Sequence, residues 1–169
     1  MTDEKDFGFG GVPSLLTGTE STLVAEIPKA GTRWKQVHFN IDVMRRFFHL
    51  ERGNARSITQ ERISPGGAVQ SRNSRQLVFS DANKNSRLEF DFDPLPMYPA
   101  SGEKPILVAV EAVYLTFRYK LVMPGDPGYI PLSNLLAAGQ SIGKGTRRRI
   151  VTLDEVEAYW PQAGLRGSA

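Results

Sequence analysis

The stretch ILVAVEAVYLTFRYKLV at residues 106–122 decides the fold class. It divides into Ile106–Val113 and Leu115–Val122, two runs rich in the β-branched and aromatic residues that are typical of strands. The first run is so apolar that it predicts a strand at the centre of a sheet. Its uninterrupted apolar part, Ile106–Val110, is much shorter than the roughly 18 residues needed to cross a bilayer.

Other short runs on either side of this stretch predict the rest of the sheet. Arg33–Asn40 alternates polar and apolar residues as a half-buried strand does. Arg75–Ser80 and Arg87–Phe92 predict a hairpin, because the connection between them is rich in turn-forming residues. Further strands are expected at Thr22–Ile27, Ala55–Ser64 and Arg147–Val151.

Short helices are predicted between the groups of strands. The apolar spacing around Asp42 predicts one helix, which Gly53 ends. Ser133 predicts the start of a second helix, and Thr152 with Glu155 has the form of a capping box that starts a third. Because the helices come singly, the sequence predicts an α+β fold with two or three short helices. Its sheet is expected to be mainly antiparallel, curved or barrel-like, with six to seven strands.

The chain is expected to contain one globular domain with an extension at each end. Residues 1–31 hold glycine and proline at a spacing that breaks helices and strands, which predicts a flexible or extended arm with one short strand. Residues 32–161 are predicted to form the single α+β domain, and residues 162–169 a C-terminal tail. Within the domain, Asp93–Lys104 is a proline-rich loop whose length favours an interaction role.

Composition narrows the class of protein. The chain has 169 residues, of which 40% are hydrophobic and 23% charged, enough to build a real core. It has no cysteine, which excludes disulfide bonds, thiolate catalysis and cysteine-ligated zinc. Met1–Phe9 is acidic and lacks the apolar segment of a secretory signal, so we expect a cytoplasmic protein that does not enter the membrane.

The sequence lacks the motifs of common enzymes. His38 and His49 have no metal-ligand spacing, and the serine elbow Gly-x-Ser-x-Gly does not occur. The glycine-rich stretch at 139–145 has glycine where a phosphate-binding loop has serine or threonine after its lysine, so it is interpreted as a mobile basic loop. We therefore expect no cofactor and no resident metal, and enzymes are the less favoured class.

Three carboxylates keep one enzymatic alternative open. Glu89, Asp91 and Asp93 alternate along a predicted strand, which would place them on one face. Such a group is able to bind a hard cation such as Mg²⁺, as in a metal-dependent nuclease. The simpler interpretation is a solvated outer face, opposite the apolar residues Leu88, Phe90 and Phe92.

The charge is small in total but uneven along the chain. The net charge is only +3, yet residues 33–75 carry nine basic and three acidic side chains. Residues 104–150 carry a second basic excess, of seven against two. If the fold brings these segments together, they form a strong positive patch; the alternative is a solvated surface with both signs mixed. We predict that segments 33–75 and 144–149 share one face.

The basic residues also have the neighbours that suit nucleic acid. Arginine predominates over lysine and is mixed with serine, threonine, asparagine and glutamine, which favours bidentate contacts to phosphates and base edges. No aromatic-rich RNA-recognition signature occurs, and DNA is favoured over RNA as the partner. The candidate nucleic-acid-binding residues are Arg56, Arg62, Arg72, Asn73, Arg75, Asn83, Lys84, Arg87, Lys144, Arg147, Arg148 and Arg149.

A structural or adaptor subunit of a larger protein assembly is the main alternative. The glycine-rich arm and the proline-rich loop at 93–104 would then dock onto a protein partner. Three aromatic side chains that we expect at the surface, Tyr98, Tyr129 and Trp160, would contribute to that contact.

The predicted order of elements adds a resemblance to the residue-based argument. Strand, short helix, strands, hairpin, strands, short helix and strand resembles pseudobarrel DNA-reading domains, including the specificity domains of some restriction enzymes. The resemblance rests on element order alone and assigns no family. It implies that loops such as 70–75 and 81–87 read the major groove.

Overall fold

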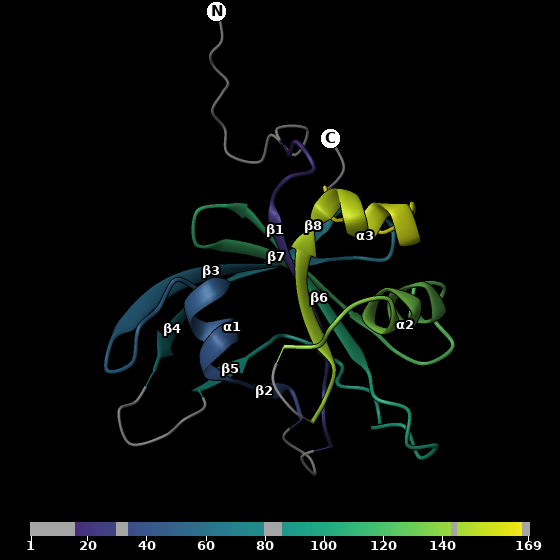
Figure 1. The fold of residues 1–169 in the computed structure, drawn as a ribbon, viewed down its shortest axis with the longest axis horizontal. Coiled ribbons are helices and arrows are strands. Elements are labelled where there is room, and N and C mark those ends of the chain that lie inside the picture. Colours follow the sequence, from purple (N-terminus) through teal and green to yellow (C-terminus); the bar gives the residue numbers. More distant parts are fainter. Residues whose placement is uncertain (1–15, 30–33, 80–85, 143–144, 167–169) are drawn as a thin grey trace, which may run out of the picture.

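The computed structural model describes residues 16–29, 34–79, 86–142 and 145–166. Within these residues the chain forms eight strands and three helices (Figure 1). The strands are β1 (Ser21–Glu26), β2 (Gln36–Phe39), β3 (Ala55–Ile63), β4 (Val69–Val78), β5 (Ser86–Glu89), β6 (Ile106–Val113), β7 (Thr116–Val122) and β8 (Arg148–Thr152). The helices are α1 (Ile41–Arg46), α2 (Tyr129–Ala137) and α3 (Leu153–Tyr159).

Six of the strands form one mixed sheet in the order β4-β3-β7-β6-β1-β8, and β2 pairs with β5 in a second, two-stranded sheet. All neighbours in the main sheet are antiparallel except β3 and β7, which run parallel. The sheet ends at β4 on one side and at β8 on the other, so it is not closed. The predicted α+β class with a mainly antiparallel sheet is confirmed.

The apolar stretch that was expected to be central forms β6, which lies between β7 and β1 and is buried on both faces. β1 comes from the segment 1–31, where we expected an arm with one short strand. In the structure it lies between β6 and β8, and Leu23 and Val24 are completely buried on opposite faces. The apolar side chains of β1 thus belong to the domain core, and residues 1–15 lie outside the described residues.

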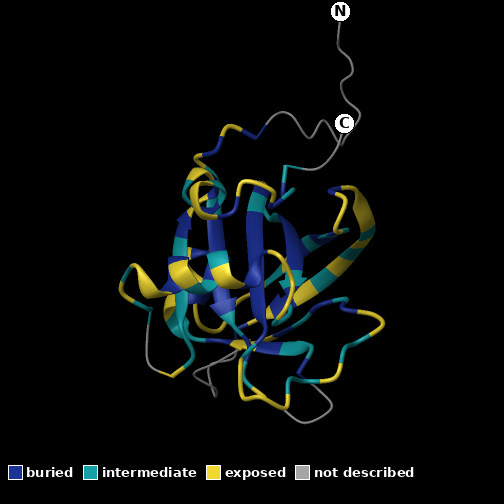
Figure 2. Cartoon of the chain, turned by 90° about the vertical axis from the view of Figure 1, so that its right-hand side faces the viewer, coloured by how far each residue is buried: buried dark blue, intermediate teal, exposed yellow. Residues whose placement is uncertain are grey.

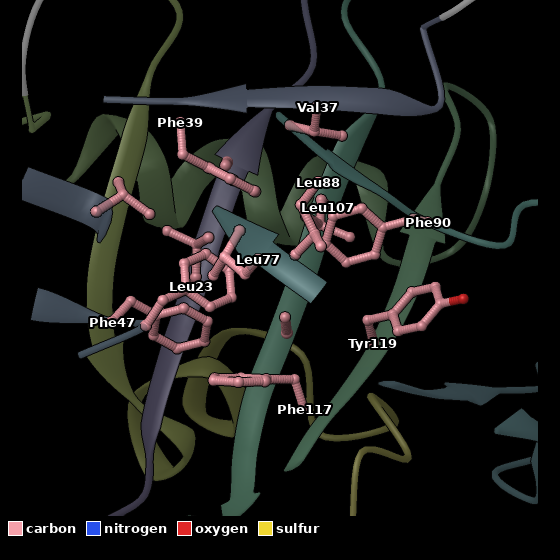
Figure 3. Close-up of a cluster of buried hydrophobic side chains, with 14 of the residues drawn as sticks. Leu23, Val37, Phe39, Phe47, Leu77, Leu88, Phe90, Leu107, Phe117 and Tyr119 are labelled. Atoms are coloured by element: carbon pink, nitrogen blue, oxygen red, sulfur yellow. The ribbon is translucent and has the colours of Figure 1, made fainter. Parts of the chain in front are cut away.

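One face of the sheet is covered by α1 and the two-stranded sheet, which enclose an aromatic cluster (Figure 3). Phe47, the C-cap residue of α1, lies 5.0 Å from Phe117 in β7, measured between ring centroids. Figure 3 shows the hydroxyl of Tyr119 directed away from the other labelled side chains. That hydroxyl donates to the carbonyl of Asp91 at 2.8 Å, and burial raises the pKa of Tyr119 to about 12.

The opposite face of the central strands is covered by α2 and α3, which Figure 1 shows on the other side of the sheet from α1. Leu132 and Val156 from these helices pack with Val108 of β6 in a second apolar cluster. Ala163 and Leu165, from the expected C-terminal tail, are buried in the same cluster. Figure 2 shows this concentration of buried residues in the central strands.

Two helix starts show where local sequence rules hold and where they fail. The side chain of Thr152 accepts a hydrogen bond from the backbone N–H of Glu155 at 3.2 Å, as the predicted capping box requires. The start predicted at Ser133 is wrong, because α2 begins at Tyr129. Pro131 lies in its first turn, where a backbone N–H has no partner within the helix and proline is therefore tolerated.

Candidate nucleic-acid interface

β3 and β4 form a long antiparallel pair at one edge of the main sheet, here called the β3–β4 ribbon. Residues 70–75, expected to be a loop, are part of the ten-residue strand β4. The sequence pattern hid this strand because polar residues occupy both of its faces: every residue from Val69 to Arg75 is at least partly exposed. β4 is an edge strand whose side chains reach solvent on both sides.

Arginine occurs on both faces of the β3–β4 ribbon. Residues that are paired across an antiparallel ladder point to the same face, so the register fixes which side chains are neighbours. One face carries Arg56, Gln60, Arg62, Ser71, Asn73 and Arg75. The other face carries Ser57, Thr59, Glu61, Arg72, Ser74 and Gln76.

Arg72 shares a single carboxylate with a second arginine. Its guanidinium donates to Glu61, whose other oxygen accepts from Nε of Arg118 at 2.9 Å. Burial favours a raised pKa for Glu61, but the hydrogen bonds from Arg118 and Arg72 outweigh it and hold the pKa below its ordinary value. Since one carboxylate binds two guanidinium groups, the cluster of Glu61, Arg72 and Arg118 keeps a net positive charge. The side chain of Arg72 is 59% exposed, so this charge reaches the surface.

The other face of the β3–β4 ribbon repeats this pattern around Asp91. Ser71 donates to Asp91 at 3.0 Å, and Nη1 of Arg62 lies 3.6 Å from its Oδ1. Burial of Asp91 opposes its ionisation, but hydrogen bonds from the backbone of Asp93 and from Ser71, together with Arg62 and Arg75, lower its pKa. Nε of Arg75 donates to the amide oxygen of Gln60 at 3.3 Å, so this arginine is held by a neutral group.

Arg56 and Arg87 have no carboxylate partner among the described residues. Nη1 of Arg56 donates to the hydroxyl of Tyr114 at 3.1 Å, while its Nε is buried with no hydrogen-bond partner. Arg87 in β5 is exposed and donates to the side chain of Gln36 at 3.4 Å. Arg87 lies opposite His38 in the two-stranded sheet, and burial together with the Arg87 charge lowers the pKa of His38. Asn83 and Lys84 lie outside the described residues.

The arginines at 147–149 contact their own domain. Arg147 binds Glu26 through its backbone N–H at 2.8 Å and through its guanidinium at 3.1 Å. Arg149 donates to the carbonyl of Leu135 at 2.7 Å and to Glu155 at 3.2 Å. Arg148 is half-buried, which lowers the pKa of its guanidinium. Lys144 lies outside the described residues.

The structure places the arginines of the β3–β4 ribbon and those of β8 at opposite edges of the main sheet, although Arg46 of the first basic segment and Arg149 of the second line one pocket. β4 and β8 are the opposite edges of the main sheet, with four strands between them. At about 4.8 Å per strand spacing, the path along the sheet from one edge to the other is roughly 24 Å. The arginines of the β3–β4 ribbon and those of β8 are therefore not neighbours in the sheet, and the two basic segments meet through α1, at Arg46 and Arg149.

The three carboxylates considered for a metal do not form a cluster. Only Glu89 lies in β5, which ends there, and its carboxylate is 3.8 Å from the ammonium of Lys35. Asp91 is engaged by Ser71 and Arg62, as described above. Across the described ranges no group of three or more His, Cys, Asp or Glu side chains could hold a metal ion.

The aromatic residues expected to dock onto a protein partner contact the interior instead. The hydroxyl of Tyr98 donates to the carbonyl of Ile27 at 2.7 Å, and that of Tyr129 donates to the carbonyl of Lys104 at 2.8 Å. Trp160 is only 8% exposed. Asp93–Lys104 is indeed a loop without helix or strand. In the part of the chain that is described, no helix is long and apolar enough to cross a membrane.

Comparisons with known proteins identify the fold but no family. No family model matches the chain, and no curated protein matches it. Among solved structures, the fold is similar to the N-terminal domain of Helicobacter pylori LlaJI.R1, with a TM-score of 0.54. The two sequences are 12% identical, and the match covers 78% of this chain and 97% of that domain. At this identity the likeness concerns the fold alone.

Proposed function

We propose that the chain is a DNA-binding module whose contact surface is the β3–β4 ribbon. The observation that carries this proposal is the imbalance of charge at that edge. Four arginines, at 56, 62, 72 and 75, lie on a ribbon with two neighbouring carboxylates: Glu61, which Arg72 shares with Arg118, and Asp91, which pairs with Arg62. Most of the other exposed positions are serine, threonine, asparagine and glutamine, which hydrogen-bond to bases and phosphates, while Ala55, Val69 and Val78 at the strand ends are exposed and apolar.

The dimensions of the β3–β4 ribbon suit a DNA groove. The major groove of B-DNA is about 12 Å wide and admits a two-stranded β-ribbon. β4 has ten residues, which corresponds to a length of roughly 33 Å. The loop between the strands, residues 64–68, contains Pro65 and two glycines and adds no bulky side chain at the tip.

We assign different roles to the exposed and the half-buried side chains. Arg72 and Arg87 are exposed and suit phosphate contacts, which supply affinity but no sequence preference. Arg62, Asn73 and Arg75 lie on one face and are partly held by neighbours, as base-reading side chains need to be. Arg56 stands on the same face, next to Tyr114.

The similarity of fold supports this proposal without carrying it. The chain shares its fold with the N-terminal domain of Helicobacter pylori LlaJI.R1. Its element order also resembles that of DNA-reading domains of some restriction enzymes. The adaptor alternative keeps the loop at 93–104 but has lost the support of Tyr98, Tyr129 and Trp160, so DNA binding is the function that we carry forward.

The internal contacts of Arg147 and Arg149 give them a smaller role in this proposal. Their guanidinium groups neutralise Glu26 and Glu155, so they act on DNA mainly through the long-range field of the domain. Asn83, Lys84, Arg148 and Lys144 stay predicted contacts, since neither the structure nor the comparisons test them.

The test is equilibrium binding of the full chain to a labelled duplex of about 20 base pairs, at about 50 and 200 mM salt. We expect Arg72→Ala/Arg75→Ala to weaken binding at both concentrations and to lower the salt slope by up to about two charges. Arg45→Ala is the matched control, because Arg45 lies on α1 and is paired with Glu51 at the surface. Salt-insensitive binding, or equal affinity of the double variant and the wild type, would contradict the proposal.

A further inference from the structure

A cavity of about 420 Å³ opens where β3 separates from β7. The pairing of these strands ends at Arg62 and Tyr119, although β7 continues to Val122. The space beside the last residues of β7 is therefore not filled by another described strand. Its wall is mostly apolar and includes Phe92, Pro94, Val122, Met123 and Trp160.

Lys120 lies in this wall with a mostly buried side chain, and its ammonium has no anionic partner among the described residues. The residue is only 7% exposed, yet its ammonium forms no hydrogen bond or ion pair with the described residues. Its Nζ lies 5.3 Å from the centroid of the Trp160 ring, which gives a cation–π contact. Arg118, two residues earlier on the same face, is equally buried but has Glu61 and the carbonyl of Arg166 as partners.

The other charged groups around the cavity do not neutralise Lys120. Arg62 also lines the cavity and donates to the carbonyl of Asp93 at 2.6 Å. Asp126 is the acidic residue of the wall, and its Oδ2 accepts from the backbone N–H of Met123 at 2.8 Å. Burial lowers the pKa of Lys120, which shows how poorly its charge is solvated. An unpaired charge in such a place is costly, and an anion would remove that cost.

The residues of the wall favour a small anion over a nucleobase as the ligand. A nucleobase turned out of a duplex would need a free aromatic face to stack on. Trp160 does not offer one, since it lies under the ammonium of Lys120 and packs against Gly128, where an added Cβ would come within 2.6 Å of the indole. The cavity instead combines the unpaired ammonium of Lys120 with a mostly apolar wall.

We propose that this cavity binds a small organic anion, with its carboxylate or phosphate on the ammonium of Lys120 and its apolar body against Phe92, Pro94 and Met123. The site adjoins the β3–β4 ribbon, whose Arg62, Ile63 and Gln70 line part of the cavity, but the proposed contact with Lys120 does not depend on DNA binding. It would make the domain responsive to a metabolite-sized ligand.

The test uses the full chain and three probes: benzoate, phenyl phosphate and the neutral analogue benzamide. Binding is followed by the amide chemical shifts of residues 120–123, Trp160 and Gln162. We expect one of the two anions to bind at least about tenfold more tightly than benzamide, because a charge-assisted hydrogen bond is available only to the anion. Comparison of benzoate with phenyl phosphate then identifies the preferred headgroup.

Two variants separate the ammonium from general effects on the fold. Lys120→Met removes the charge but keeps an unbranched side chain, and should weaken anion binding at least about tenfold. Lys35→Met, at a surface lysine paired with Glu89, should bind as the wild type does. Equal binding of benzamide, unchanged binding by Lys120→Met, or no binding of either anion would overturn the proposal. So would a loss of duplex DNA binding in Lys120→Met, because the ammonium would then belong to the DNA surface.

Discussion

Arg118 in β7 donates from Nε to Oε1 of Glu61 in β3 at 2.9 Å, although both residues are almost fully buried. The pair joins the two parallel strands of the main sheet. Arg72 of β4 donates to the other oxygen of Glu61, so one carboxylate links three neighbouring strands. The β3–β4 ribbon is thereby fixed to the core of the domain by a side chain that solvent barely reaches.

Replacement of Glu61 should therefore be costly. Glu61→Gln leaves the charge of Arg118 buried without a counter-ion, and we expect a loss of about 3–5 kcal/mol in the free energy of unfolding. Urea unfolding of the full chain measures it. Glu51→Gln is the control, since Glu51 pairs with Arg45 at the surface and its loss should cost less than about 1 kcal/mol. Equal destabilisation by both variants would contradict the assigned role of Glu61.

Low pH should destabilise the fold by protonating Glu61 and Asp91. The pKa values of Glu61 and Asp91 are lowered in the folded protein, so the unfolded chain takes up protons first as the pH falls. Their stabilisation is complete above the ordinary values of 4.5 and 3.8 and is lost as the pH falls through the lower folded values. Urea unfolding between about pH 7 and pH 3 should show this decline. The decline should be shallower in Glu61→Gln; an unchanged slope would refute this attribution.

Lys120→Met should stabilise the free protein. Burial lowers the pKa of Lys120 in the folded state, so its charged form opposes folding at neutral pH. The stability of the wild type should therefore rise as the pH increases from the folded pKa to the ordinary value of 10.5. Removing the amine should add about 1 kcal/mol, or a rise of roughly 2–4 °C in Tm. Calorimetry at neutral pH provides the measurement. A clear fall in Tm would show that the contact with Trp160 outweighs the burial of the charge.

Gly128→Ala should destabilise the wall of the cavity. A Cβ at this position would lie 2.6 Å from Cη2 and Cζ2 of Trp160, which belong to a rigid ring. We expect a loss of about 1–3 kcal/mol, measured by urea unfolding. Gly66→Ala is the matched control, because its nearest contact would be the Ser64 hydroxyl at 3.9 Å. A neutral effect of Gly128→Ala would mean that Trp160 moves freely and does not define the cavity.

Sequence reasoning succeeded where burial imposes a simple pattern. The centrality of Ile106–Val113 followed from its apolar composition, and the cap at Thr152 from local hydrogen-bonding rules. It failed at residues 70–75, because an edge strand with two solvated faces has no apolar alternation and resembles a polar loop. The sequence placed β1 in an extended arm and not in the core of the sheet, because glycine and proline flank it on both sides.

The candidate site was predictable only in part, because charge along a sequence does not give partners in space. Arg72 and Arg147 look alike in the sequence, yet Arg147 is neutralised by Glu26, 121 positions away. The sequence did not indicate a site at Lys120, since an isolated lysine in a strand normally extends to solvent. Its isolation from carboxylates became visible only when the neighbouring strands were in place.

The most direct test of the central claim is an amide chemical-shift titration of the full chain with a duplex of about 20 base pairs. DNA binding through the β3–β4 ribbon predicts the largest changes in Ala55–Ile63 and Val69–Val78, and only small ones in β8. The changes should decrease steeply between about 50 and 200 mM salt. Largest changes in Arg148–Thr152, or no change at the lower salt concentration, would contradict the account.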